Sequence, residues 1–296
     1  MCVTEQGRNT WEQATSNCYS LKWGQSHKGT VPGDNRKKIM ENDILLEADH
    51  IQMTFPQKGG GLHVLEDISL TLKKEEFVCI IGPSGSGKST LVRILGGLLE
   101  PTGGKLIYPD GKEPDPRAVV FQNSNLLPWL HTADNVALPL LVKGVPKKEA
   151  LKEAESWLDL FGLGGFANEW PNNISGGMAQ RVAIARALIQ KPQLLLMDEP
   201  LGALDAMTRE QISLELMAFR ERIDATVLMV THSISEALLL SDRILIYSGR
   251  PARIIDEMKV PFPRPRTPEL RDTVEFLAMS KMIRKKIFSQ ENGGVS

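Results

Sequence analysis

The stretch that decides the fold runs from Phe77 to Thr90 and reads FVCIIGPSGSGKST. Its first five residues are all apolar, which is typical of a strand buried on both faces of a parallel sheet. Gly82 to Ser89 then fit the pattern GxxxxGK[ST], and the apolar spacing of LVRILGGLL behind them predicts a helix. Glycines allow a loop to fold around phosphates with its N–H groups pointing inward, and the start of a helix favours an anion. The stretch therefore predicts a phosphate-binding loop.

Two side chains of this loop have predicted roles of their own. We expect Lys88 to reach the terminal phosphates of a nucleotide and Ser89 to bind Mg²⁺. A glycine-rich turn formed by chance is the alternative, but chance does not readily supply the lysine, the hydroxyl and both flanking elements together. The predicted nucleotide contacts of the loop are Gly82, Pro83, Ser84, Gly85, Ser86, Gly87, Lys88, Ser89 and Thr90.

A second apolar strand, LLLMDEP from Leu194 to Pro200, delivers two acids at its carboxyl end. Ligands bind at that edge of parallel α/β sheets. Asp198 suits Mg²⁺, and Glu199 can hold the water that attacks a phosphate. A solvated strand end or a helix cap is the alternative for such a pair, and four preceding apolar residues beside a phosphate-binding loop make it the weaker interpretation.

A histidine ends a third buried strand, ATVLMVTH from Ala225 to His232. We expect His232 at the same sheet edge, where it could contact the terminal phosphate. A lone histidine in such a place is more often structural, so this interpretation depends on the resemblance described below.

The segment ISGGMAQ, from Ile174 to Gln180, reads as the beginning of a helix. A Ser-Gly-Gly opening with free N–H groups and a hydroxyl is itself an anion site. The alternative is a glycine-permitted loop that enters an ordinary helix. Because the chain already holds a complete phosphate loop, a second anion site points to a second nucleotide or to a partner subunit.

Together, ISGGMAQRVAIARAL, LLLMDEPLGALD and the phosphate loop resemble the ATPase subunits of ATP-binding cassette (ABC) transporters, from about Ile44 to Val260. The resemblance implies an α/β P-loop NTPase with a RecA-like parallel sheet core, an antiparallel β subdomain and a helical signature subdomain. It also implies ATP and Mg²⁺ as cofactors, with two ATP molecules held between two head-to-tail subunits.

The same resemblance assigns roles to single residues. Ser175, Gly176, Gly177 and Gln180 would hold the γ-phosphate of the partner's ATP. Phe55 would stack on adenine, Asp205 would form the D-loop, Glu199 would be the catalytic base and His232 the switch histidine. Gln122 would sense Mg²⁺ and the γ-phosphate, so that the predicted metal-binding residues are Ser89, Gln122 and Asp198.

Four positions depart from the common family pattern. Phe55 replaces a tyrosine, Ile174 a leucine, Ala179 a polar residue and Glu75 a turn glycine before the phosphate-loop strand. Stacking contributes only ~0.5 to 1.5 kcal/mol beyond burial, so the phenylalanine should cost little. A residue other than glycine at Glu75 adjusts a turn, and no predicted catalytic group is lost.

The segment LLPWL, Leu126 to Leu130, predicts an apolar cluster that either packs in a core or forms a groove for a short helix of a membrane partner. With GRPARIIDEMKVPFPRPR, it is similar to the ATPases of nitrate, sulfonate and taurine importers. This similarity implies a separate permease, a homodimer, and a substrate-binding protein that acts through the permease. It also implies a peripheral location on the cytoplasmic face of the inner membrane.

The pattern of elements predicts three segments. Residues 1–42 are expected to be a disordered extension, 43–260 the ATPase domain with a helical subdomain at about 125–180, and 261–296 a linker with a short helical tail. At the start of the ATPase domain we expect three strands, at 44–55, 62–65 and 68–72, with a turn at 56–61. The proline-rich stretch after Val260 marks the start of the linker.

Composition excludes several classes of protein. A formal net charge of -1 supplies no basic field for nucleic acid, and no apolar run approaches the ~20 residues of a membrane-spanning helix. A soluble ABC ATPase that works on nucleic acid or ribosomes stays as the alternative, although two fused cassettes or a long coiled coil usually accompany that role and neither is evident. A P-loop kinase or a GTPase leaves the Ser-Gly-Gly segment unexplained, and the guanine-reading motif NKxD is absent from the sequence.

Overall fold

The structure is a computed structural model, and it describes residues 43–109, 111–220 and 224–291. The predicted extension at 1–42 and the last five residues of the tail lie outside these ranges. The strands are β1 (Ile44–Gln57), β2 (Gly60–Lys73), β3 (Phe77–Ile81), β4 (Gly103–Ile107), β5 (Arg117–Val120), β6 (Leu194–Asp198), β7 (Thr226–Val230), β8 (Arg243–Tyr247) and β9 (Ile254–Lys259). The α-helices are α2 (Lys88–Leu95), α3 (Thr132–Val142), α4 (Lys147–Leu160), α5 (Gly176–Leu188), α6 (Ala206–Arg220), α7 (Ile234–Leu240) and α8 (Val274–Glu291), and the short 3-10 helices are η1 (Gly164–Phe166), η2 (Pro171–Asn173) and η3 (Pro268–Asp272).

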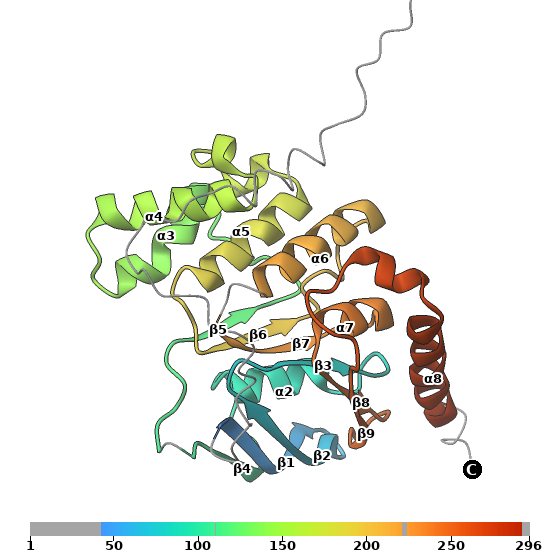
Figure 1. Cartoon of the computed structure of the whole chain (residues 1–296). Coiled ribbons are helices and arrows are strands. Elements are labelled where there is room, and N and C mark those ends of the chain that lie inside the picture. The colour runs from blue at the N-terminus through green and yellow to red at the C-terminus, as the bar shows by residue number, and fades with distance from the viewer. Residues whose placement is uncertain (1–42, 110, 221–223, 292–296) are drawn as a thin grey trace, which may run out of the picture. The chain divides into compact units, whose positions relative to one another are not determined.

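The central sheet has six strands in the order β5-β6-β7-β3-β8-β9. Its first five strands are parallel, which confirms the predicted parallel sheet, and β9 pairs antiparallel with β8 in a hairpin around Gly249. Helices lie on both faces of this sheet (Figure 1). The architecture is the predicted P-loop NTPase fold.

Alternate residues of the central strands enter two different hydrophobic cores. In β3, Phe77, Cys79 and Ile81 belong to the core shared with the helices α3 to α7, whereas Val78 and Ile80 belong to the core shared with α2, β1 and β2. Figure 1 shows α5, α6 and α7 over one face, with α2 and the smaller sheet on the other. Burial on both faces explains why the strand sequence is apolar without alternation.

The smaller sheet, β2-β1-β4, is antiparallel and corrects the predicted strands. The two segments expected at 62–65 and 68–72 form one strand, β2, which pairs with β1 from end to end. The polar pair Glu66-Asp67 lies in an irregularity of this pairing, where Asp67 has a φ of 58° and His50 opposite has a φ of 51°. The polar interruption is therefore a bulge, and β4 and β5 were not among the predicted strands.

The turn before β3 shows how Glu75 replaces a glycine. Glu75 has a φ of 60°, in the left-handed region that glycine favours. Its N–H donates to Thr226 Oγ1 at 3.0 Å, and its carbonyl accepts from Arg220 Nη2 at 2.5 Å. These two contacts hold the turn in a backbone conformation that a side chain normally disfavours.

Three helices, α3, α4 and α5, pack together on the side of the sheet that carries β5 (Figure 1). The helix α4 ends at Leu160, and the chain turns at Gly162, which has a φ of 68°. The described residues form one compact unit, with no division between subdomains. The predicted helical subdomain at about 125–180 and the other predicted domain limits therefore stay predictions.

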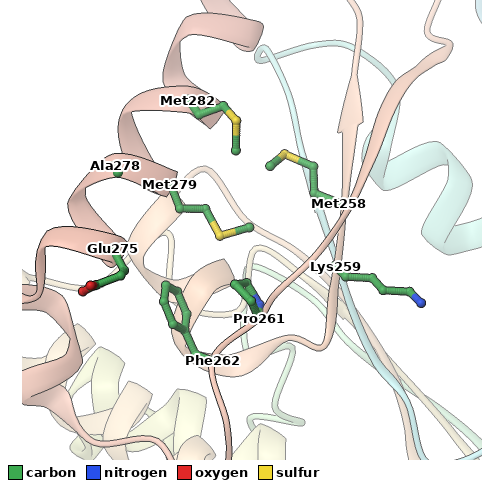
Figure 2. Close-up of a pocket in the computed structure, with 8 residues that line it drawn as sticks. All are labelled: Met258, Lys259, Pro261, Phe262, Glu275, Ala278, Met279 and Met282. Atoms are coloured by element: carbon green, nitrogen blue, oxygen red, sulfur yellow. The ribbon is translucent and has the colours of Figure 1, made fainter.

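The helix α8 packs along the edge of the sheet, with Phe276 and Ile283 buried. A hollow of about 480 Å³ lies between β9, the segment after it and α8. Figure 2 shows the side chains of Met258, Met279 and Met282 directed into this hollow. Flexible thioether side chains adapt to irregular spaces, so this contact between the tail and the sheet is apolar but loosely filled.

Candidate functional site

The phosphate loop connects β3 to α2, as the sequence predicts, and two of its glycines are required by close packing. A β-carbon at Gly82 would lie 2.7 Å from Cβ of Tyr247 on β8. A β-carbon at Gly87 would lie 2.6 Å from Cγ1 of Val64 on β2, and Gly87 also has a φ of 93°. The loop therefore passes so close to both sheets that a β-carbon at either position would overlap a neighbour, and the positive φ of Gly87 also favours glycine.

Lys88 is the first residue of α2, and its side chain folds back over the loop. Its ammonium group donates to the carbonyl oxygens of Gly82 at 3.1 Å and Pro83 at 2.7 Å, and to Ser86 Oγ at 3.4 Å. Burial lowers the pKa of Lys88, and the carboxylates of Glu199 and Asp198 act in the opposite direction. The cation is thus placed over the loop and close enough to both acids to interact with them.

Ser89 and Asp198 meet where α2 begins and β6 ends. Ser89 Oγ donates to Asp198 Oδ1 at 2.8 Å, and Asp198 is only 6% exposed. Burial raises the pKa of Asp198, while the hydrogen bond from Ser89 lowers it. A hydroxyl and a carboxylate held in contact beside a phosphate loop form the hard oxygen donor set that Mg²⁺ prefers, so these residues fit the predicted metal.

Glu199 and His232 form a close pair just beyond β6 and β7. Oε1 of Glu199 lies 2.5 Å from Nε2 of His232, and the side chains are 18% and 45% exposed. Glu199 has a φ of 49°, a strained conformation for a residue with a long side chain. Its N–H donates to the Val230 carbonyl at 3.0 Å, which fixes this turn on the neighbouring strand. The sequence placed both side chains at one sheet edge, and the structure brings them into contact.

Gln122 lies in the segment after β5. Its amide nitrogen is 3.2 Å from where a β-carbon on Gly202 would be, in the loop that follows Glu199. Gln122 itself is exposed. The structure therefore brings the predicted Q-loop residue to the same loop as the predicted catalytic base.

The Ser-Gly-Gly segment forms the start of α5. Ser175 is the N-cap, and its Oγ accepts a hydrogen bond from the N–H of Met178 at 3.3 Å. A β-carbon at Gly176 would meet no atom within 4 Å, whereas one at Gly177 would lie 2.4 Å from Cγ2 of Thr208 on α6. Asp205 accepts from the N–H of Thr208 at 3.0 Å, and this bond lowers the pKa of Asp205. The first turns of α5 and α6 thus lie together.

Gln180 is placed differently from the other predicted signature residues. It is only 2% exposed, and its amide nitrogen donates to the carbonyl of Phe121 at 3.2 Å. The prediction that Gln180 contacts a nucleotide bound to another chain does not agree with this burial. A glutamine in the first turns of α5 faces the segment that carries Gln122, because that segment packs against the helix.

The structure also identifies arginines whose roles the sequence did not indicate. Arg186 on α5 donates to the carbonyls of Ser124 at 2.9 Å and Asn125 at 3.0 Å, so it holds the segment after Gln122. Arg209 on α6 donates to the carbonyls of Leu201 at 3.1 Å and Leu204 at 2.8 Å, so it holds the loop between Glu199 and Asp205. Their contacts are to backbone carbonyls, which leave no pattern in the sequence.

Phe55 lies on β1, where it pairs with Leu62 of β2. It is partly buried and packs at the margin of the core shared with α2, on the hairpin that also contributes Val64 beside Gly87. The role of Phe55 in stacking on adenine stays a prediction.

No hydrogen bond or ion pair in residues 43–109, 111–220 and 224–291 connects the Ser175-Gly176-Gly177 segment with the phosphate loop. Within the described residues, the two groups that the sequence predicts to bind anions are therefore not bonded to each other. One group has the carboxylates, the hydroxyl and the histidine beside it, and the other has only the helix start and the adjoining D-loop.

The family model and the sequence relatives that match this chain all belong to one family. The family model described as "ABC transporter" matches residues 65–202. Among relatives, the nitrate import ATP-binding protein NrtD of Synechococcus elongatus is 44% identical over 77% of this chain and 85% of its own length. The taurine import ATP-binding protein TauB of Pelagibacter ubique is 43% identical over 73% of this chain and 83% of its own length. The aliphatic sulfonates import ATP-binding protein SsuB of Bacillus cereus is 40% identical over 85% of this chain and 98% of its own length.

A solved structure agrees with the sequence relatives. It is a dimeric ATP-binding cassette in a post-hydrolysis state, bound to ADP and Pi. It aligns with a TM-score of 0.65 and 35% identity, and the match covers 74% of this chain and all of that one.

The contact between Gly177 and Thr208 leads to a test of how α5 and α6 fit together. We expect Gly177→Ala to lower the free energy of unfolding by about 1 to 3 kcal/mol, because the added methyl group overlaps Thr208. The melting temperature should fall accordingly. Thr208→Ser removes the overlapping methyl group and should restore most of the loss. Gly176→Ala is the matched control and should not lower the melting temperature. Equal effects of the two alanines in thermal unfolding would show that the contact is unimportant.

Proposed function

The chain belongs to the ABC transporter family of ATP-binding proteins, and from this membership we propose that it is the energy-coupling ATPase subunit of an importer for a small anion. The observation that carries the proposal is the contact of Ser89 with Asp198 and of Glu199 with His232 beside one phosphate loop. The relatives, which are ATP-binding proteins for nitrate, taurine and aliphatic sulfonate import, favour nitrate, taurine or another sulfonate as the transported class.

In this proposal the phosphate loop binds ATP through its backbone N–H groups. Lys88 pairs with the terminal phosphates. To do so, its ammonium group gives up its present contacts with the loop carbonyls. Ser89, Asp198 and Gln122 would hold Mg²⁺, which when bound would neutralise charge on the phosphate oxygens. Phe55 would stack on adenine.

Glu199 is proposed as the group that positions the attacking water and takes its proton. Its carboxylate is largely shielded, and its strained turn fixes the direction in which it points. His232 lies in contact with it and is more exposed, so its ring can hold the carboxylate with one nitrogen while facing the terminal phosphate. The pair thus combines a proton acceptor with a group that orients it.

The second anion site is proposed to act on the ATP of another copy. Ser175, Gly176 and Gly177 would contact the γ-phosphate bound to the partner's phosphate loop, with Asp205 at the same interface. Both glycines are at a helix start with free N–H groups, and the space around Gly176 is open. We assign Gln180 to positioning, since it ties α5 to the segment of Gln122.

The exposed side chain of Trp129 is proposed as part of the permease contact. Trp129 is 68% exposed, and the loop that carries it is bonded to Asn135. Asn135 is fully buried and bonds both the N–H and the carbonyl of Leu127, and it also donates to the carbonyl of Leu130. A fixed and exposed tryptophan is a common anchor in protein interfaces.

We further propose that the chain lies on the cytoplasmic face of the membrane, bound to a permease. A substrate-binding protein would deliver the substrate to this permease. Among the described helices, none is long and apolar enough to cross a membrane.

Replacement of the catalytic base tests the hydrolytic part of the proposal. We expect Glu199→Gln to bind ATP as the wild type does and to lower turnover by roughly 10² to 10⁴, the range of a lost general base. Glu155→Gln, on the exposed face of α4, is the control and should leave turnover unchanged. Near-normal steady-state hydrolysis by Glu199→Gln would remove Glu199 from this role.

Recovery of the membrane partner tests the transport part. We expect a tagged chain, purified from detergent-solubilised membranes of the source cell, to bring down a multi-span permease that mass spectrometry identifies. Trp129→Glu should lose the permease but keep ATP binding, because Trp129 lies outside the nucleotide site. Recovery of ribosomal or nucleic-acid partners alone would contradict the importer function.

A further inference from the structure

The short helix α7 ends in four consecutive backbone carbonyls that no helical N–H can satisfy. They belong to Leu238, Leu239, Leu240 and Ser241, and all four accept hydrogen bonds from guanidinium groups. The donors are Arg264 and Arg266, which lie more than twenty residues later in the chain, in the segment PFPRPR that follows β9.

Arg266 makes most of these contacts and is almost completely buried, with 9% exposure. Its Nη1 donates to Leu238 at 2.9 Å, Leu239 at 3.2 Å and Ser241 at 2.6 Å, and its Nε donates to Phe262 within its own segment at 3.1 Å. A positive charge at the end of a helix is favoured by the helix dipole. Backbone carbonyls at the end of α7 therefore accept hydrogen bonds from the buried guanidinium group of Arg266.

Arg264 completes the arrangement and connects it to the phosphate-loop strand. Its Nη2 donates to Leu240 at 2.6 Å, and its Nε donates to Asp242 Oδ1 at 3.0 Å. The other oxygen of Asp242 accepts from the N–H of Phe77, the first residue of β3, at 2.9 Å. Burial by itself would raise the pKa of Asp242, but the Phe77 N–H and the guanidinium groups of Arg264 and Arg220 outweigh it and hold the pKa below its usual value.

The other end of α7 adjoins His232. Ser233 is the N-cap, and its Oγ accepts from the N–H of Glu236 at 3.2 Å. The side chain of Glu236 bonds Thr231, whose Oγ1 donates to Glu236 Oε2 at 2.5 Å and accepts from the N–H of Ser233 at 3.0 Å. His232 is thus held between two residues that are bonded to α7.

We propose that Arg266, assisted by Arg264, is a positioning residue for His232, and that the segment after β9 serves the nucleotide site by holding α7 in place. The helix has seven residues, too few to be stable without contacts at its ends. When the carbonyl end of such a helix is released, its first turn shifts with it, and so does the histidine that precedes that turn. The inference rests on the proposed role of His232 in hydrolysis.

The test is Arg266→Lys in the full chain. Lysine keeps the charge, but a single ammonium group cannot reproduce the planar fork that reaches four carbonyls. We expect turnover to fall by about 2- to 30-fold, the range for residues that act on a site through others, with the KM for ATP unchanged because the phosphate loop is intact. Arg284→Lys on the exposed face of α8 is the matched control and should change neither value.

Two further measurements separate positioning from general stability. The His232 ring resonance, assigned among the five histidines by its loss in His232→Ala, should shift in Arg266→Lys and stay unchanged in Arg284→Lys. In a double-mutant cycle, Arg266→Lys should cause no additional loss of turnover once His232 is alanine. Arg264→Lys removes fewer bonds to α7 and should move the same resonance in the same direction by a smaller amount.

An unchanged His232 resonance in both lysine variants, or the same fold loss with and without His232, would overturn the inference. If His232→Ala keeps wild-type turnover, the proposed role of His232 in hydrolysis fails, and the resonance shift still decides whether Arg266 positions the ring. The two failures are therefore distinguishable.

Discussion

The register of three neighbouring parallel strands is the constraint on which the rest of the structure depends. β7 lies between β3 and β6, and its residue Val230 is level with Ile80 on one side and Asp198 on the other. The three strands therefore end together, and the chain leaves them as the phosphate loop, the acidic pair and the histidine. Backbone bonds from Glu199 to Val230 and from Thr231 to Ile80 continue this alignment past the strand ends. A shift of one residue in any of the three strands would separate Ser89 from Asp198 or Glu199 from His232.

The groups that could be predicted from the sequence are those that belong to short, contiguous motifs. The phosphate loop, the strand that delivers Asp198 and the capped start of α5 each combine a local pattern with a flanking element, so that placing the element also places the side chain. Strand limits in the smaller sheet were wrong because Glu66 and Asp67 read as the end of a strand. In the structure they occupy a bulge, which the pairing of β1 with β2 tolerates.

The contacts that the sequence could not supply are those made between side chains and distant carbonyls. Gln180 matched a family position, but its direction depends on the packing of α5 against the segment of Phe121. Arg186, Arg209 and Arg266 bind backbone oxygens that are 4 to 62 residues away, and any residue can offer such an oxygen. The sequence of the segment that accepts the hydrogen bond therefore does not identify that segment as the partner. The residues that support the site can therefore be identified only from the three-dimensional structure, whereas the reacting groups could be proposed from the sequence.

The central claim is that one chain supplies the phosphate loop and another supplies the Ser-Gly-Gly helix start. The most direct measurement is the ATPase activity of two inactive variants, Lys88→Ala and Ser175→Arg, assayed separately and mixed. In a mixed dimer, one site would combine the intact phosphate loop of the Ser175→Arg chain with the intact helix start of the Lys88→Ala chain. The account predicts that hydrolysis reappears on mixing, although each variant alone is inactive. A mixture as inactive as its components, or a Ser175→Arg chain that is active alone, would contradict it.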